Sequence, residues 1–189
     1  MNLRTAIFSA LACGTLAMPF ALSAQQSTTP GATMQAAAAQ KVSGDDKDFL
    51  EDAAQSGHAE IEGSKLALRK TANPDIKAFA EQMIADHTKV GDELTALAKQ
   101  KGYTPPTEPS LVQATKIKAI SVMDGDSFDK SYANQIGVSV HEDAVELFQE
   151  TANEAKDPDI KAFAAKHLPA LQQHLELARA LKQKVDPGS

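Results

Sequence analysis

The chain has 189 residues, with 19 Lys and Arg against 25 Asp and Glu, which gives a net charge of −6. This acidic balance, with no tryptophan and two tyrosines, disfavours nucleic-acid binding, which needs basic surface for phosphates and aromatic surface for bases. The one cysteine, Cys13, lies near the N-terminus, so the rest of the chain has no disulfide and no thiolate metal site.

Residues 1–24 have the pattern of a secretory signal peptide. Arg4 precedes an uncharged run over residues 6–20, and small residues follow, with cleavage expected after Ser23 or Ala24. Loss of Arg4 leaves 18 basic against 25 acidic residues, a net charge of −7. No later apolar run reaches about 18 residues, so the mature chain is expected to have no transmembrane helix. These features predict an exported, periplasmic protein.

The part of the chain before the folded domain offers two further expectations. Leu11 to Gly14, around Cys13, resembles a bacterial lipoprotein site, but most of the apolar stretch follows the cysteine, so lipid anchoring is disfavoured. Residues 25–44 are rich in Gln, Ala, Thr, Ser and Gly and show no apolar period, which predicts a flexible tether.

The folded domain, expected over residues 45–185, contains an internal repeat. The seven residues 74–80 return letter for letter as residues 158–164. Asn73 and Asp157 precede these copies as N-cap residues, and each copy has proline at the first helical position. Both copies therefore predict helix starts.

Apolar residues at helical spacing predict four long helices and one short one, at about 45–71, 74–101, 110–122, 128–155 and from 158 onward. Residues 186–189 are a short tail. The second and third long helices are joined by a connection long enough to return along a bundle. The expected fold is all-α, a four-helix bundle built from two pseudo-repeated helical hairpins with one long connection.

Titratable residues gather near the middle of this expected bundle. At 1.5 Å per residue, four histidines lie about 21–25 Å from the loop of their own hairpin: His58, His87, His141 and His174. Carboxylates within about two turns of that height are Glu60, Glu62, Asp86, Glu142 and Glu146. Imidazole and carboxylate together suit zinc, copper, iron or nickel. In the alternative interpretation, the histidines are hydrogen-bonded core residues that fix the register of the helices.

Other chemistry is disfavoured by the pattern. A carboxylate-bridged di-iron site needs Glu three residues before a histidine on two helices, and this chain has Ile84 before His87 and Leu171 before His174. The expected mature chain has no cysteine and no serine elbow, so it offers no candidate for nucleophilic catalysis, and it has no glycine-rich loop to hold phosphate.

Four segments resemble, in order, the motifs of one bacterial family: residues 59–67, 83–87, 141–142 and 168–174. This is an exported domain-of-unknown-function family with a ferritin-like fold, whose members are often labelled outer membrane proteins. The resemblance spans about residues 45–184. It implies a ferritin-like four-helix bundle of no established activity, with motif positions at Glu60, Glu62, Asp86, His87, His141 and His174. His58 and His167 lie outside these motifs.

The leading hypothesis is a transition metal ion (Zn, Fe, Cu or Mn) at mid-bundle, in envelope metal handling or stress response. The predicted metal site consists of His87, His141 and His174 with Glu60, Glu62 and Asp86. The alternative is a non-catalytic structural or interaction module of the cell envelope, whose acidic face would dock an envelope protein.

Overall fold

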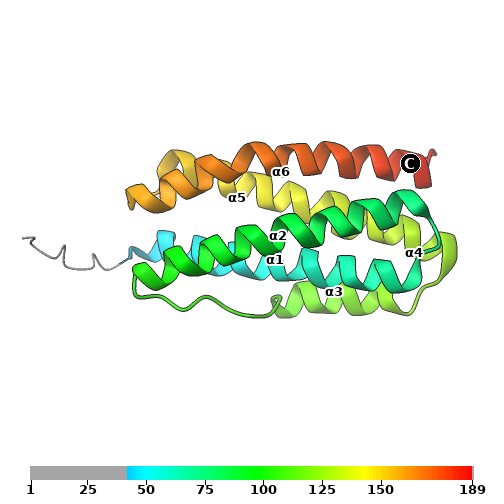
Figure 1. Ribbon diagram of the computed structural model, residues 1–189, viewed down its shortest axis with the longest axis horizontal. Helices are drawn as coiled ribbons and strands as arrows, with labels where there is room; N and C mark the ends of the chain where they lie inside the picture. Colours follow the sequence, from blue (N-terminus) through cyan, green and yellow to red (C-terminus); the bar gives the residue numbers. More distant parts are fainter. Residues whose placement is uncertain (1–41, 189) are drawn as a thin grey trace, which may run out of the picture. The chain divides into compact units, whose positions relative to one another are not determined.

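The structure, a computed structural model, describes residues 42–188; the predicted signal peptide and most of the predicted tether lie outside this range. The described residues contain helices and no strand (Figure 1). The elements are α1 (Gly44–Lys70), α2 (Pro74–Gln100), α3 (Leu111–Ser121), α4 (Gly125–Ser131), the π-helix η1 (Tyr132–Ser139), α5 (Val140–Glu154) and α6 (Pro158–Val185). None of these helices is long and apolar enough to span a membrane.

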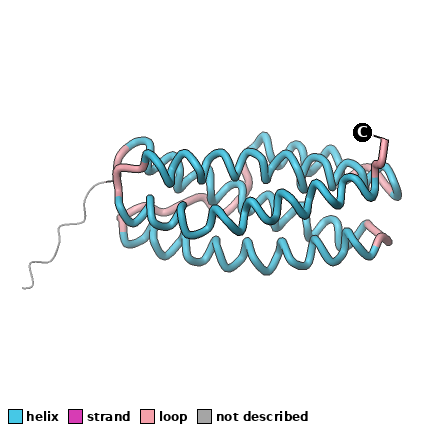
Figure 2. Tube along the Cα trace, turned by 90° about the horizontal axis from the view of Figure 1, so that it is seen from above, coloured by secondary structure: helices cyan, strands magenta, loops and turns pink. Residues whose placement is uncertain are grey.

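Four long helical rods form the bundle: α1, α2, the continuous segment α4–η1–α5, and α6. α1 packs mainly on α2, and α5 mainly on α6, as the two predicted hairpins require. α2 also packs on α6, and α1 on α5, which closes the bundle. The chain leaves α2 at one end and runs back along the bundle through α3 before α4 begins at the other end (Figures 1 and 2). This long crossover gives the ferritin-like arrangement expected from the resemblance.

Side-chain caps explain where the repeated helices start. The Asn73 side chain accepts hydrogen bonds from backbone N–H groups at the start of α2, and Asp157 does the same for α6. Lys101, just after the end of α2, binds the start of α6, because its Nζ lies 2.7 Å from Asp157 Oδ2 and 2.6 Å from Asp159 Oδ2. The helix starts predicted from the repeat are therefore confirmed.

The start of α1 is tied to the far hairpin. Ser43 caps the helix by accepting a hydrogen bond from the backbone N–H of Asp46. The buried carboxylate of Asp46 accepts hydrogen bonds from the backbone N–H groups of Lys156 and Asp157, both at 3.1 Å. Asp46 therefore satisfies the backbone of the α5–α6 loop, which fixes the height of one hairpin against the other.

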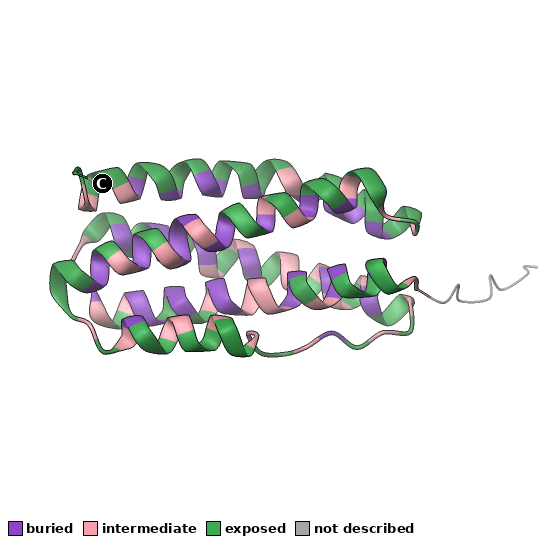
Figure 3. Ribbon diagram, turned by 180° about the vertical axis from the view of Figure 1, so that it is seen from behind, coloured by how far each residue is buried: buried purple, intermediate pink, exposed green. Residues whose placement is uncertain are grey.

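Buried residues recur along all the long helices (Figure 3). They form two apolar clusters with polar residues between them. One cluster contains Phe49 and Phe148 near one end of the bundle, and the other contains Phe79 and Tyr132. On each of the four helices a buried titratable side chain lies between the two clusters: Glu60 on α1, His87 on α2, His141 on α5 and His174 on α6. The fold thus brings these four side chains to one level.

The third rod differs from the prediction of one regular helix over about 128–155. It begins at Gly125, and residues Tyr132–Ser139 form the π-helix η1. A π-helix has a wider turn, which changes the direction of the side chains that follow. Gly137 lies inside this turn, and a Cβ there would be 3.4 Å from Ala178 Cβ on α6. His141 follows directly after η1.

Candidate metal centre

Three histidines and one glutamate meet at the middle of the bundle, one from each long helix. The exposed fractions are 1% for Glu60 and His141 and 4% for His87 and His174. One nitrogen from each of the three histidines lies within 4.8 Å of the others. The four side chains therefore share one buried volume.

The spacing of the three rings fits a single metal ion. Their centroids are 5.4 Å apart for His87 and His141, 5.3 Å for His87 and His174, and 5.6 Å for His141 and His174. An ion about 2.0–2.1 Å from one nitrogen of each ring lies about 3.2 Å from each centroid, so tetrahedral or trigonal binding separates the centroids by about 5.2–5.5 Å. The observed spacing matches this expectation.

Each ring has one nitrogen fixed by an oxygen acceptor. His87 Nδ1 lies 2.7 Å from Glu60 Oε2, and His174 Nε2 lies 3.0 Å from Asp86 Oδ2. His141 Nδ1 donates to the backbone carbonyl oxygen of Gly137 at 2.8 Å, where η1 passes into α5. Metal-binding histidines characteristically donate their second N–H to a carboxylate or a carbonyl group, which sets the tautomer and orients the ring.

The other nitrogen of each ring is buried and has no hydrogen-bond partner among the described residues: His87 Nε2, His141 Nε2 and His174 Nδ1. A buried polar atom left without a partner costs about 1–3 kcal/mol. Three such atoms at one level are therefore a marked departure from ordinary core histidines, whose polar atoms are satisfied.

Glu60 adds a fourth donor. Its Oε1 has no hydrogen-bond partner within residues 42–188 and lies 3.4 Å from His141 Nε2. Because His141 donates through Nδ1, its Nε2 presents a lone pair to a carboxylate oxygen, a contact that becomes favourable when a cation lies between them. Two ligand atoms of a tetrahedral ion are about 3.3 Å apart, given metal–ligand distances of about 2.0–2.1 Å.

Burial and neighbouring charges set the protonation of the cluster. Burial opposes the charged form of Glu60, but the attraction of His87 and His141 lowers the pKa of Glu60 below its ordinary value. Burial likewise opposes a charge on His87, but Glu60 raises the pKa of His87 above its ordinary value. Burial and the nearby His87 lower the pKa values of His141 and His174. These directions favour the charged forms of Glu60 and His87 and the neutral forms of His141 and His174.

Two predicted site residues have other positions. Asp86 is half-buried and lies outside the cluster, where it orients His174. Glu62 does not join the cluster: it is exposed and lines a shallow pocket beside α3. Two residues along a helix amount to a rotation of about 200°, so Glu60 and Glu62 point to opposite sides of α1. The expectation of Glu62 as a ligand is therefore corrected.

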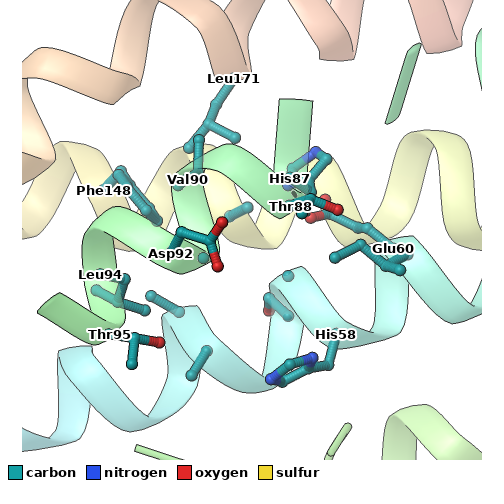
Figure 4. A pocket seen from close by; sticks show the side chains of 17 residues that line it. His58, Glu60, His87, Thr88, Val90, Asp92, Leu94, Thr95, Phe148 and Leu171 are labelled. Carbon is teal, nitrogen blue, oxygen red and sulfur yellow. Dashed lines mark ion pairs between the residues drawn. The ribbon is translucent and has the colours of Figure 1, made fainter. Parts of the chain in front are cut away.

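The remaining histidines lie apart from the cluster. His58 is half-buried, and its ring points away from His87 in the close view of the pocket between α1 and α2 (Figure 4). His167 is buried beside Phe163, and its Nε2 lies 3.0 Å from Glu93 Oε2. The four-histidine level expected from the sequence thus becomes three histidines and Glu60.

The described geometry can be set beside known proteins. Residues 31–181 match the model of a family described as a domain of unknown function, DUF4142. The chain belongs to this family. A crystal structure of a DUF305 fragment from Deinococcus radiodurans superposes with a TM-score of 0.67 at 10% sequence identity, covering 77% of this chain and 99% of that one. No curated protein matches the chain in sequence.

These matches confirm the predicted family resemblance and the ferritin-like bundle. At 10% identity the DUF305 likeness speaks for the fold alone. DUF4142 is a family defined by its sequence and named for its unknown function. The chemistry of this protein is therefore argued from its own buried cluster.

Proposed function

We propose that this protein binds one first-row transition metal ion through His87, His141 and His174, with Glu60 as the fourth ligand or as its charge partner. The observation that carries the proposal is the set of three buried ring nitrogens without partners. Each belongs to a ring already oriented by a hydrogen bond from its other nitrogen. The ring spacing supports a single ion rather than a pair.

The donor set narrows the choice of metal. Three imidazoles and one carboxylate suit zinc, copper and iron, whereas manganese prefers sites richer in oxygen. The single carboxylate leaves a divalent site with a net charge of +1, in a pocket with few other charges. Among the expected metals, the Irving–Williams order predicts that copper(II) binds most tightly in vitro.

The cellular role that we propose is metal handling in the bacterial envelope, in normal growth or under stress. Its support is the signal-peptide pattern of residues 1–24 and the absence of a membrane-spanning helix among residues 42–188. A metal site in an exported chain must take its ion from the periplasm or deliver it there.

Two histidines on α6 provide a matched test of the proposal. His174 and His167 are both buried, and each places Nε2 3.0 Å from a partly exposed carboxylate oxygen, of Asp86 and Glu93 respectively. Only His174 belongs to the cluster. We expect zinc to raise the melting temperature of the wild type and of His167→Leu, but not that of His174→Leu.

Ligand linkage sets the size of this effect. Zinc at 100 times its Kd should stabilise the folded state by about 2.7 kcal/mol. Differential scanning calorimetry measures this stabilisation. If zinc stabilises both variants equally, the ion lies elsewhere and the proposal is contradicted.

A further inference from the structure

A pocket of about 150 Å³ adjoins the proposed metal site. Its deep end is lined by Glu60 and His87, and its exposed lining residues, Thr88 and Asp92, are on α2 (Figure 4). The walls are mainly apolar and include Phe148. The pocket therefore connects the protein surface with two of the proposed metal-site residues.

The pocket occupies the layer of the bundle directly beside the cluster. Each long helix lines it with a residue three or four positions from its own cluster residue: Gly57 before Glu60, Gly91 after His87, Ala144 after His141 and Leu171 before His174. Such a separation is about one helical turn. Because neighbouring helices are antiparallel, all four displacements point toward the same end of the bundle.

The layer on the other side of the cluster is closely packed. A Cβ at Gly63 would lie 2.9 Å from Ile136 Cγ2, so this glycine is required by the contact between α1 and η1. In contrast, a Cβ at Gly57 or Gly91 would meet nothing within 4 Å. Glycine inside a helix costs about 0.5–1 kcal/mol relative to alanine. These two glycines leave space open beside the cluster.

The chemistry of the pocket selects its occupant. Apolar cavities of about 150 Å³ hold molecules such as benzene. Asp92 is an acidic residue at the rim, and the mainly apolar walls would leave an anion poorly solvated. An uncharged molecule with an apolar body and one donor atom satisfies both the walls and a metal ion.

We infer that this pocket is a binding site for a small uncharged molecule of about the size of benzene, which places one nitrogen or oxygen donor on the bound metal. The inference rests on the proposed metal site and adds the class of its exogenous ligand. The pocket also gives this ligand a route from the surface between α1 and α2.

The test uses cobalt(II), whose visible spectrum reports its ligands, and pyridine as the probe. Cobalt content is measured first in the wild type, in Gly91→Leu, which fills the pocket, and in Ala96→Leu, which adds the same side chain on the exposed side of α2. Pyridine should change the cobalt spectrum of the wild type and of Ala96→Leu. We expect Gly91→Leu to bind cobalt normally and to need at least about tenfold more pyridine. Azide, an anion of smaller size, should bind more weakly than pyridine.

The outcomes separate the two proposals. Absence of bound cobalt contradicts the metal site, before any pyridine is added. Bound cobalt with a spectrum that pyridine leaves unchanged, or changes equally in Gly91→Leu, overturns the inference about the pocket while the metal site stands. A second measurement depends on no metal: benzene should raise the melting temperature of the metal-free wild type but not that of Gly91→Leu, and equal shifts would also overturn the inference.

Discussion

Glu60 lies between two imidazoles, with Oε2 2.7 Å from His87 Nδ1 and Oε1 3.4 Å from His141 Nε2. It is the carboxylate of the cluster that is fully buried, so it supplies the negative charge that offsets a divalent ion. The first oxygen orients a ligand ring, and the second faces the proposed ion. One residue thus combines positioning and charge.

Replacing this carboxylate gives the first prediction. Glu60→Gln keeps the shape of the side chain but removes its charge and replaces one carboxylate oxygen with an N–H donor. We expect the affinity for zinc to fall by about 10–100-fold, the range typical for loss of a group that supports metal ligands. Competition with a chromophoric chelator measures this change. Glu62→Gln, two positions away on the exposed side of α1, is the control, and an equal loss there would refute the assignment.

Proton release gives the second prediction. His87 has a pKa raised above its ordinary value of 6.5, whereas the pKa values of His141 and His174 are lowered from 6.5. Above pH 6.5 and below the raised pKa of His87, the metal therefore displaces a proton mainly from His87, so the affinity rises with pH. Below pH 6.5 the slope steepens as the other two histidines become protonated.

Calorimetry of zinc binding in buffers with different ionisation enthalpies counts these protons. A release of up to about one proton per ion is expected at pH 7, and it should increase as the pH is lowered. No release, or the release of three protons at that pH, would show that the charges of the cluster are assigned wrongly.

At the scale of the helices, the sequence predicts where a helix starts better than it predicts which way the side chains of that helix point. Asn73 and Asp157 marked the starts of α2 and α6 because N-cap chemistry is local. The π-helix Tyr132–Ser139 was not predicted, because its wide turn follows from contacts with other helices, at Gly63 and at Ala178. Such contacts leave no local signal.

The candidate site shows the same division. The heights of His87, His141 and His174 follow from counting residues, but height alone also admitted His58 and Glu62. Which of these side chains points into the core depends on the rotation of each helix about its axis. Three positions at a spacing of seven residues, Ala53, Glu60 and Ala67, are buried on α1. This spacing would have placed Glu60 on the core side of the helix. It was the signal that could have separated Glu60 from Glu62.

The helical glycines give a third prediction, which compares two positions. Gly91→Ala should stabilise the fold by about 0.5–1 kcal/mol, because the new Cβ meets nothing within 4 Å and glycine disfavours the helix. Gly63→Ala should destabilise it by about 1–3 kcal/mol, because its Cβ would lie 2.9 Å from Ile136 Cγ2. Urea denaturation measures both. Destabilisation by Gly91→Ala would mean that the pocket is closed.

At the scale of the whole molecule, the cluster joins all four long helices. One residue comes from each of α1, α2, α5 and α6, so the site exists only when both hairpins are docked. An ion bound there would link the two halves of the internal repeat. Metal binding and the folding of the bundle should therefore be coupled, since the unfolded chain does not present these ligands together.

The most direct measurement is the metal content of the full chain, expressed and purified without an affinity tag, beside that of His87→Leu and His167→Leu. We predict close to one transition metal ion per chain in the wild type and in His167→Leu, and loss of that ion in His87→Leu. Wild-type protein that contains no metal and takes up neither zinc, copper, iron nor manganese on titration would contradict the central claim.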